Sequence, residues 1–166
     1  RDLDVANHWT RRAEEGEFEL DALLGYLAGI PTYSLSAELA SCRPLCGDIL
    51  AVPFPSKLAV SAPLRWRFCR SFSLDYARVL AKSGNIVGAT GQAAKAVMEE
   101  AHAIVCERGQ WVLNEKGLIE TAGLAGVQGL FAQVPNDSAS IVQWVDLVAD
   151  QLGVPKGDLS PWVSRN

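Results

Sequence analysis

The sequence contains few of the features by which enzymes, metal proteins and membrane proteins are usually recognised. It has no GxSxG nucleophile elbow, no P-loop and no GxGxxG fingerprint. Histidine occurs only twice, and the four cysteines form no CxxC pair, so the common zinc-site spacings are excluded. No apolar run approaches the ~20 residues that a membrane-spanning helix needs. We therefore expect no membrane association and no metal site within this chain.

The cysteines and the charge point to an ordinary cytoplasmic protein. Cys42 and Cys46 are separated by Pro44, which makes a shared helical face unfavourable, and Cys69 and Cys106 are distant from both. We expect all four to be reduced thiols that act mostly as small apolar fillers. The formal net charge of -4 and the isoelectric point near 5.2 argue against a non-specific nucleic-acid binder, which needs a basic face.

What the sequence does contain is helical periodicity. Apolar residues make up 49% of the 166 residues and recur at helical spacing, whereas no alternating β-pattern of useful length occurs. Glycine, proline and capping residues divide the chain into eight predicted helices, at about 4–16, 18–28, 32–43, 56–83, 86–108, 114–122, 125–134 and 137–153. Residues 44–55 are predicted to form a loop. The prediction is an all-α bundle of about seven or eight helices, in one domain over residues 1–166.

Helical spacing also predicts which side chains share a face. Within helix 18–28 the shared face is apolar and consists of Leu20, Leu23, Leu24 and Leu27. Within helix 56–83 the apolar face consists of Phe68, Phe72, Tyr76 and Val79. The same helix carries Arg67, Arg70 and Arg78, which we expect on a solvated face, whereas Arg65 either frays at the first turn or points inward.

The first group of candidate binding residues surrounds the helix break at Gly29 to Pro31. Tyr26 and Tyr33 lie on either side of this break and could offer rings and hydroxyls to a planar or sugar-like ligand. Alternatively, the two tyrosines simply cover the joint between two helices. Glu38 is predicted near the inward face of the next helix, where its carboxylate would pair with a base or recognise ligand amines and hydroxyls.

The second group lies in the run WVLNEK, at the junction between two predicted helices. Asn114 is a good N-cap for the following helix, and capping explains part of the pattern. It does not explain an aromatic ring, an amide, an acid and a base within six residues. We infer that Trp111, Asn114, Glu115 and Lys116 line a site. His102 lies at the border of its helix's apolar stripe, where a packed, hydrogen-bonded histidine is a more common outcome than a catalytic one.

Two stretches carry a resemblance to a known family. GYLAGIPTYSLSAELA, followed after about sixty residues by EEAHAIVCERGQWVLNEKGLIETAGL, resembles the C-terminal helical half of bacterial nucleotidyltransferases of the polymerase-β superfamily. The most similar branch is that of aminoglycoside and lincosamide nucleotidyltransferases, including uncharacterised actinobacterial members. The similarity covers about Leu20 to Leu152. In such proteins an N-terminal α/β half binds Mg²⁺ and a nucleoside triphosphate, and the helical half shapes the acceptor pocket.

The resemblance implies a substrate-binding role for this chain. The residues that it places at the acceptor cleft are Tyr26, Tyr33, Glu38, His102, Trp111, Asn114, Glu115 and Lys116, with Glu38 or Glu115 as the candidate general base. The chain contains no Gly-Ser loop and starts Arg-Asp-Leu-Asp, so we expect the C-terminal fragment of a larger two-domain protein. Asp2 and Asp4 would be the tail of the strand that bears the family's third carboxylate. The partners implied are the N-terminal nucleotidyltransferase domain and a small-molecule acceptor.

Two other functions stay open at this point. The first is a non-enzymatic protein-interaction module, consistent with five tryptophans and with a homodimer. The second is a helical ribonuclease toxin, but such proteins carry an arginine four to six residues before a histidine. Neither His8 nor His102 has an arginine at that distance.

Overall fold

The structure, a computed structural model, describes residues 3–43 and 52–154 and confirms the all-α prediction. The described residues form seven α-helices and one short 3-10 helix: α1 Leu3–Glu14, α2 Ser34–Ser41, α3 Ser56–Lys82, α4 Ile86–Glu107, α5 Leu118–Ala122, η1 Ala125–Val127, α6 Gln128–Phe131 and α7 Ser138–Gln151. Within these residues, no helix combines the length and the apolar character needed to cross a membrane.

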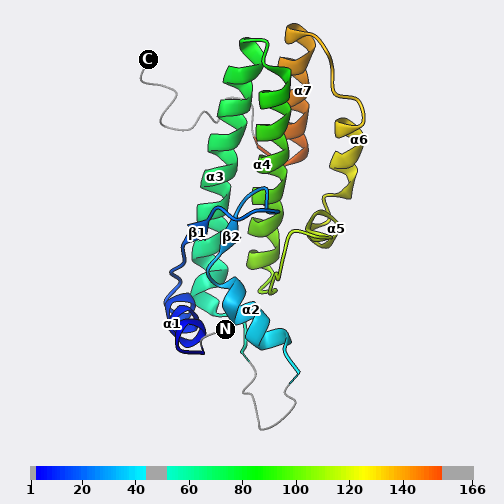
Figure 1. Cartoon of the computed structure of the whole chain (residues 1–166). Helices are drawn as coiled ribbons and strands as arrows, with labels where there is room; N and C mark the ends of the chain where they lie inside the picture. The colour runs from blue at the N-terminus through cyan, green and yellow to red at the C-terminus, as the bar shows by residue number, and fades with distance from the viewer. Residues whose placement is uncertain (1–2, 44–51, 155–166) are drawn as a thin grey trace.

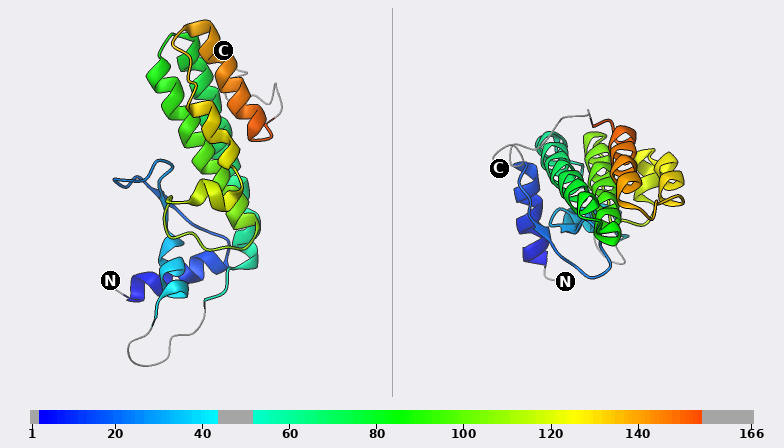
Figure 2. Two further views of the ribbon diagram at one scale, coloured as in Figure 1. Left: turned by 90° about the vertical axis from the view of Figure 1, so that its right-hand side faces the viewer. Right: turned by 90° about the horizontal axis from the view of Figure 1, so that it is seen from above.

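The two longest helices, α3 and α4, form the backbone of the molecule. They lie side by side along their whole length, and α7 packs against both at one end (Figure 1). Helices α1 and α2 contact each other at the opposite end, whereas α5 and α6 lie beside α4 and α7 (Figure 2). The contact between α3 and α4 is close because both helices present alanines to it: Ala77, Ala81, Ala89, Ala93 and Ala96 are fully buried.

The helix ends follow local chemistry, as predicted at two of them. Gly109 takes the left-handed conformation directly after α4, with φ of 65°. Asp137 caps α7, because its carboxylate accepts hydrogen bonds from the backbone N–H groups of Ala139 and Ser140 at 3.1 and 2.9 Å. Asn114, predicted to cap the helix after α4, instead precedes a turn, and α5 begins only at Leu118.

The predicted helix at 18–28 is wrong. This segment belongs to a small antiparallel hairpin in which β1, Leu20–Asp21, pairs with β2, Ile30–Pro31. Gly29, with φ of 101°, lies so close to β1 that a Cβ would be 2.9 Å from the Asp21 carbonyl oxygen. The leucines at the tip of the hairpin are exposed, so the face that they would have shared in a helix does not exist.

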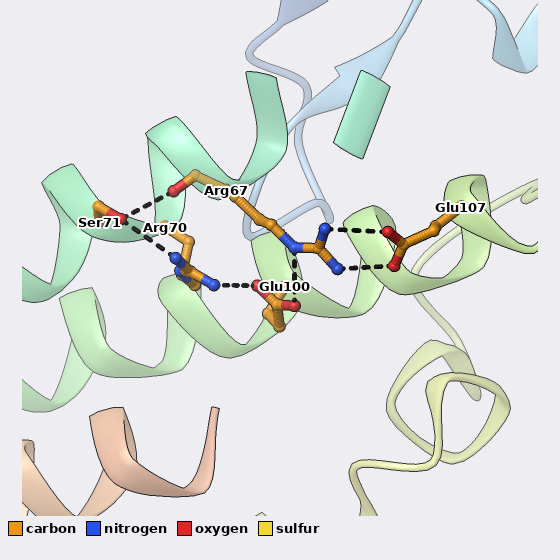
Figure 3. A network of polar contacts seen from close by, with 5 residues as sticks. All are labelled: Arg67, Arg70, Ser71, Glu100 and Glu107. Carbon is orange, nitrogen blue, oxygen red and sulfur yellow. Dashed lines mark hydrogen bonds and ion pairs between the residues drawn. The ribbon is translucent and has the colours of Figure 1, made fainter. Parts of the chain in front are cut away.

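The face prediction for the arginines of α3 is also wrong. Arg67, Arg70 and Arg78 turn toward neighbouring helices and form ion pairs with Glu107, Glu100 and Asp146, at 2.8, 2.5 and 2.9 Å. Figure 3 shows how Arg67 and Arg70 meet on Glu100, which joins α3 to α4. Arg65 is exposed instead, with its guanidinium 4.8 Å from the centre of the Phe18 ring.

The apolar face of α3 consequently points to solvent. The side chains along it follow one another at intervals of three or four residues and are about half exposed or more: Val60, Leu64, Phe68, Phe72, Tyr76 and Val79. We call these six residues the outer stripe. A helix in a globular protein normally turns such a stripe toward the core. Here the core-facing positions of α3 are mostly small residues, together with Leu58, Trp66 and Leu74.

Candidate functional site

A cleft lies between the hairpin and the middle of α3 and α4, which the hairpin crosses in Figure 1. It has a volume of about 580 Å³ and is lined by residues 20–29 and by three side chains of the helices, Cys69, Lys95 and Glu99. These three residues, which we call the polar floor, also line an adjoining hollow of about 350 Å³ together with Phe68, Phe72 and Ser73. The polar floor therefore borders both the cleft and the adjoining hollow.

Glu99 is the most unusual residue of the polar floor. It is 2% exposed, and its Oε2 atom has no hydrogen-bond partner among the described residues. The ammonium group of Lys95 lies 3.8 Å from the other carboxyl oxygen, Oε1, which is too far for a hydrogen bond. Burial raises the pKa of Glu99 to about 7, while the Ser73 hydroxyl and the charges of Lys95 and Arg70 act in the opposite direction. At neutral pH this carboxyl group can therefore either donate or accept a proton.

The position of Glu99 follows from helix geometry. It lies three residues after Ala96 and four before Ala103, and all three residues face the interior of the α3–α4 pair. Lys95 precedes it by one turn, so the two side chains are neighbours on α4. Our sequence analysis missed this pair. The signal that could have revealed it is an acidic residue in the same helical row as buried alanines, where a carboxylate is costly without a partner.

Two of the predicted residues hold the hairpin in place. The carboxylate of Glu115 accepts hydrogen bonds from the backbone N–H groups of Leu27 and Ala28, at 2.6 and 2.7 Å. The Tyr26 hydroxyl donates to the Leu113 carbonyl oxygen at 3.3 Å, and Tyr26 also lines the cleft. Glu115 is thus engaged in fixing one wall of the cleft.

Tyr33 and His102 lie in the core below the hairpin. The Trp66 indole N–H donates to the Tyr33 hydroxyl at 2.9 Å, and that hydroxyl lies 3.3 Å from the Cys106 sulfur. His102 stacks on Trp66 with ring centres 4.3 Å apart. It is packed as expected, but neither ring nitrogen has a hydrogen-bond partner among the described residues. Burial lowers the pKa of His102 to about 4 and raises that of Cys106 to about 11.

The remaining predicted residues lie elsewhere. Trp111, Asn114 and Lys116 line a separate hollow of about 290 Å³. Trp111 donates its indole N–H to the Val52 carbonyl oxygen at 2.9 Å, and the Asn114 side chain accepts from the Lys116 backbone N–H at 2.9 Å. Glu38, predicted near the inward face of its helix, is exposed on α2. The eight predicted residues therefore form no single site: Tyr26 lines the main cleft, two lie in the core, three line a second hollow, Glu115 holds the hairpin, and Glu38 is exposed on α2.

The cysteines differ in exposure, and the described residues show no cluster of metal ligands. Cys42 is exposed, Cys69 is half-buried and Cys106 is buried, all as free thiols, whereas Cys46 and Asp2 lie outside the described residues. Residues 3–43 and 52–154 contain no group of three His, Cys, Asp or Glu side chains arranged to hold a metal ion. The family resemblance implies Mg²⁺ only for a separate N-terminal half, and we derive no chemical step through that metal.

Comparison with known proteins adds no relative. No protein-family model, curated protein or solved structure matches this chain. The relationship to nucleotidyltransferases thus stays a prediction from the sequence.

The role of Glu115 leads to a first testable prediction. Replacing it with glutamine leaves one oxygen for two backbone donors and places an NH₂ group against the other donor. We expect the free energy of unfolding to fall by about 1–3 kcal/mol. Amide hydrogen exchange at Leu27 and Ala28 should accelerate more than at the core of α4. Glu120→Gln, a change at an exposed residue of α5, is the control. Unchanged exchange at the two hairpin amides would contradict the assigned role.

Proposed function

We propose that this chain forms the acceptor-binding helical part of a nucleotidyltransferase-like protein, and that the cleft above the polar floor receives a small hydroxyl-bearing acceptor. The observation that carries the proposal is the buried carboxyl group of Glu99: this residue lines the cleft, and its Oε2 atom has no hydrogen-bond partner among the described residues. A buried polar atom of this kind is stabilised when a ligand supplies a hydrogen bond. The cleft volume of about 580 Å³ also lies within the range of small-molecule sites.

The polar floor offers a specific chemistry to such an acceptor. A hydroxyl group in the cleft would donate its proton toward Glu99 Oε2, and the pKa of about 7 suits a group that accepts a proton near neutral pH. Lys95, with its ammonium 3.8 Å from Glu99 Oε1, would bind an acceptor oxygen on the other side. The nucleoside triphosphate and Mg²⁺ would be supplied by an N-terminal nucleotidyltransferase domain, in the same gene or a neighbouring one.

The test combines transfer and binding. The chain is incubated with radiolabelled ATP, Mg²⁺ and a panel of hydroxylated compounds, with and without the nucleotidyltransferase domain encoded upstream or nearby. We expect labelled product only when both are present. The hydroxylated compounds that receive the label are then tested for binding to the chain by calorimetry. Their affinity should fall about tenfold in Glu99→Gln, because a hydrogen bond to a charged group is lost.

Glu107→Gln is the matched control, because Glu107 is an exposed carboxylate of the same helix, away from the cleft. Its affinity should equal that of the unmodified chain. Transfer by the chain alone would contradict the proposal, and so would unchanged binding in Glu99→Gln.

A further inference from the structure

The outer stripe of α3 forms a long apolar surface, most of which lies outside the proposed acceptor site. Its six residues extend from Val60 to Val79, over about 30 Å of helix at 1.5 Å per residue. Phe68 and Phe72, near its middle, are each 53% exposed. Single exposed apolar residues are ordinary, but a contiguous row of this length marks an interaction surface.

Helix α4 extends the same face. Val87, Gly91 and Lys95 lie in one row, four residues apart, and this row continues to Glu99 beside Phe68 and Phe72. Val87 is 85% exposed, and Gly91 has no other atom within 4 Å of where a Cβ would lie. Lys95, the charged member of the row, faces Glu99 of its own chain. A partner for this face therefore needs apolar complementarity and no opposite charge.

The spacing of the outer stripe makes it complementary to itself. Around a point level with Arg70, Phe68 mirrors Phe72 and Leu64 mirrors Tyr76. The counterpart of Val60, ten residues beyond Arg70, is the position directly after Val79. Because isologous dimers place the same patch of two copies face to face, the two rows can pack side by side in opposite directions. A row with four-residue steps winds around its helix, so the two α3 axes would cross at about 50°. We propose that the outer stripe binds a second copy of this chain, with the two α3 helices crossing in opposite directions about a two-fold axis level with Arg70.

The surface involved is of the size that such a dimer needs. A half-exposed aromatic side chain still offers about 100 Å² to a partner. The outer stripe and its flanks therefore supply about 600 Å² per copy, or about 1,200 Å² in total, the lower bound of specific interfaces. The face lies on two packed helices, so little order has to be gained on binding. Two α3–α4 pairs would together form a four-helix arrangement.

The dimer would also affect the cleft. Phe68 and Phe72 border the hollow that reaches the polar floor from the side of the outer stripe. A second copy on this face would cover that opening and leave the hairpin side as the entrance to Glu99. This inference is independent of the proposed acceptor function, because it concerns a surface and not the bound molecule.

The experiment measures the mass of the full chain by sedimentation equilibrium, up to a concentration of about 200 µM. The mass is expected to rise from 17.9 kDa toward twice that value. Phe72→Glu should weaken association at least tenfold, whereas Leu147→Glu should not change it. The two residues are equally exposed, at 53%, but Leu147 lies on α7. A chain that stays monomeric up to that concentration, or a Leu147→Glu variant weakened as much as Phe72→Glu, would overturn the proposal.

A charge-pair experiment tests the antiparallel arrangement. Leu64→Lys and Tyr76→Glu should each weaken the dimer, and the double variant should recover at least part of the loss, because each lysine then faces a glutamate of the partner. Within one chain the two positions are about 18 Å apart and cannot pair. Circular dichroism checks that all variants keep the helical fold. A dimeric wild type whose double variant is no better than the weaker single variant would overturn the antiparallel arrangement.

Discussion

Replacing Glu100 with alanine is expected to lower the free energy of unfolding by about 3–5 kcal/mol. The Glu100 side chain is 6% exposed and accepts hydrogen bonds from Arg70 at 2.5 Å and from Arg67 at 3.3 Å. Arg70 is itself largely buried, and its Nε atom has no hydrogen-bond partner among the described residues. Without Glu100 the Arg70 guanidinium would be a buried charge with no carboxylate beside it. The free-energy cost of such an unpaired charge is larger than the net stabilisation that the intact pair provides.

The neighbouring Glu107 provides the control. Its carboxylate also binds Arg67, through two hydrogen bonds of 3.2 and 2.8 Å, but its side chain is 56% exposed (Figure 3). Because water screens an exposed pair, Glu107→Ala should cost less than about 1 kcal/mol. Urea denaturation of both variants gives the comparison. Equal losses would show that burial of Glu100 does not decide the strength of this contact between α3 and α4.

The long helices were predictable from the sequence because their signals are local. Helices α3, α4 and α7 lie within a few residues of their predicted bounds, since each combines a sustained helical period with a glycine or a capping residue at its end. The left-handed Gly109 and the cap at Asp137 depend only on neighbouring backbone groups. Chemistry of this kind is contained in a window of a few residues.

The hairpin was not predictable in that way. Its leucines occur at helical spacing, but the backbone N–H groups of Leu27 and Ala28 are bound by Glu115, which lies far along the chain. This tertiary contact and the close approach of Gly29 to Asp21 outweigh the local helical preference. A pattern within the segment contains no information about either.

The orientation of α3 shows a second limit. Helical periodicity identifies which residues share a face but not which face is buried. Close packing of α3 on α4 favours alanines at the contact, and the carboxylates of Glu100 and Asp146 on other helices draw the arginines inward. The aromatic residues are left outside, where a second copy of the chain can bind them. Glu99 was missed for a related reason, because its burial is decided by α3 and by the hairpin.

The pH dependence of stability should separate two buried groups that act in opposite directions. In the folded protein burial lowers the pKa of His102 to about 4, compared with 6.5 for an exposed histidine. The unfolded chain therefore binds a proton at pH values where the folded protein does not. The contribution of His102 to the free energy of unfolding is fully present above about pH 6.5. It falls by about 3 kcal/mol as the pH falls toward 4.

Glu99 has the opposite effect. Burial raises its pKa from 4.5 to about 7, so the folded protein keeps a proton that the unfolded chain releases. Stability is then highest below about pH 4.5 and declines by about 3 kcal/mol as the pH rises to 7. Between pH 4.5 and 6.5 the contributions of His102 and Glu99 should largely cancel in the unmodified chain.

Two variants expose the separate contributions. Urea denaturation at a series of pH values should show Glu99→Gln gaining about 3 kcal/mol relative to the unmodified chain between pH 4.5 and 7. His102→Phe keeps an aromatic ring against Trp66 and should gain a similar amount as the pH falls from 6.5 to 4. Because both results are differences from the same chain, the titration of other carboxyl groups does not enter them. A difference that stays constant with pH for either variant would mean that its group titrates alike in the folded and unfolded states. For Glu99 it would remove the pKa near neutrality on which the proposed role as proton acceptor depends.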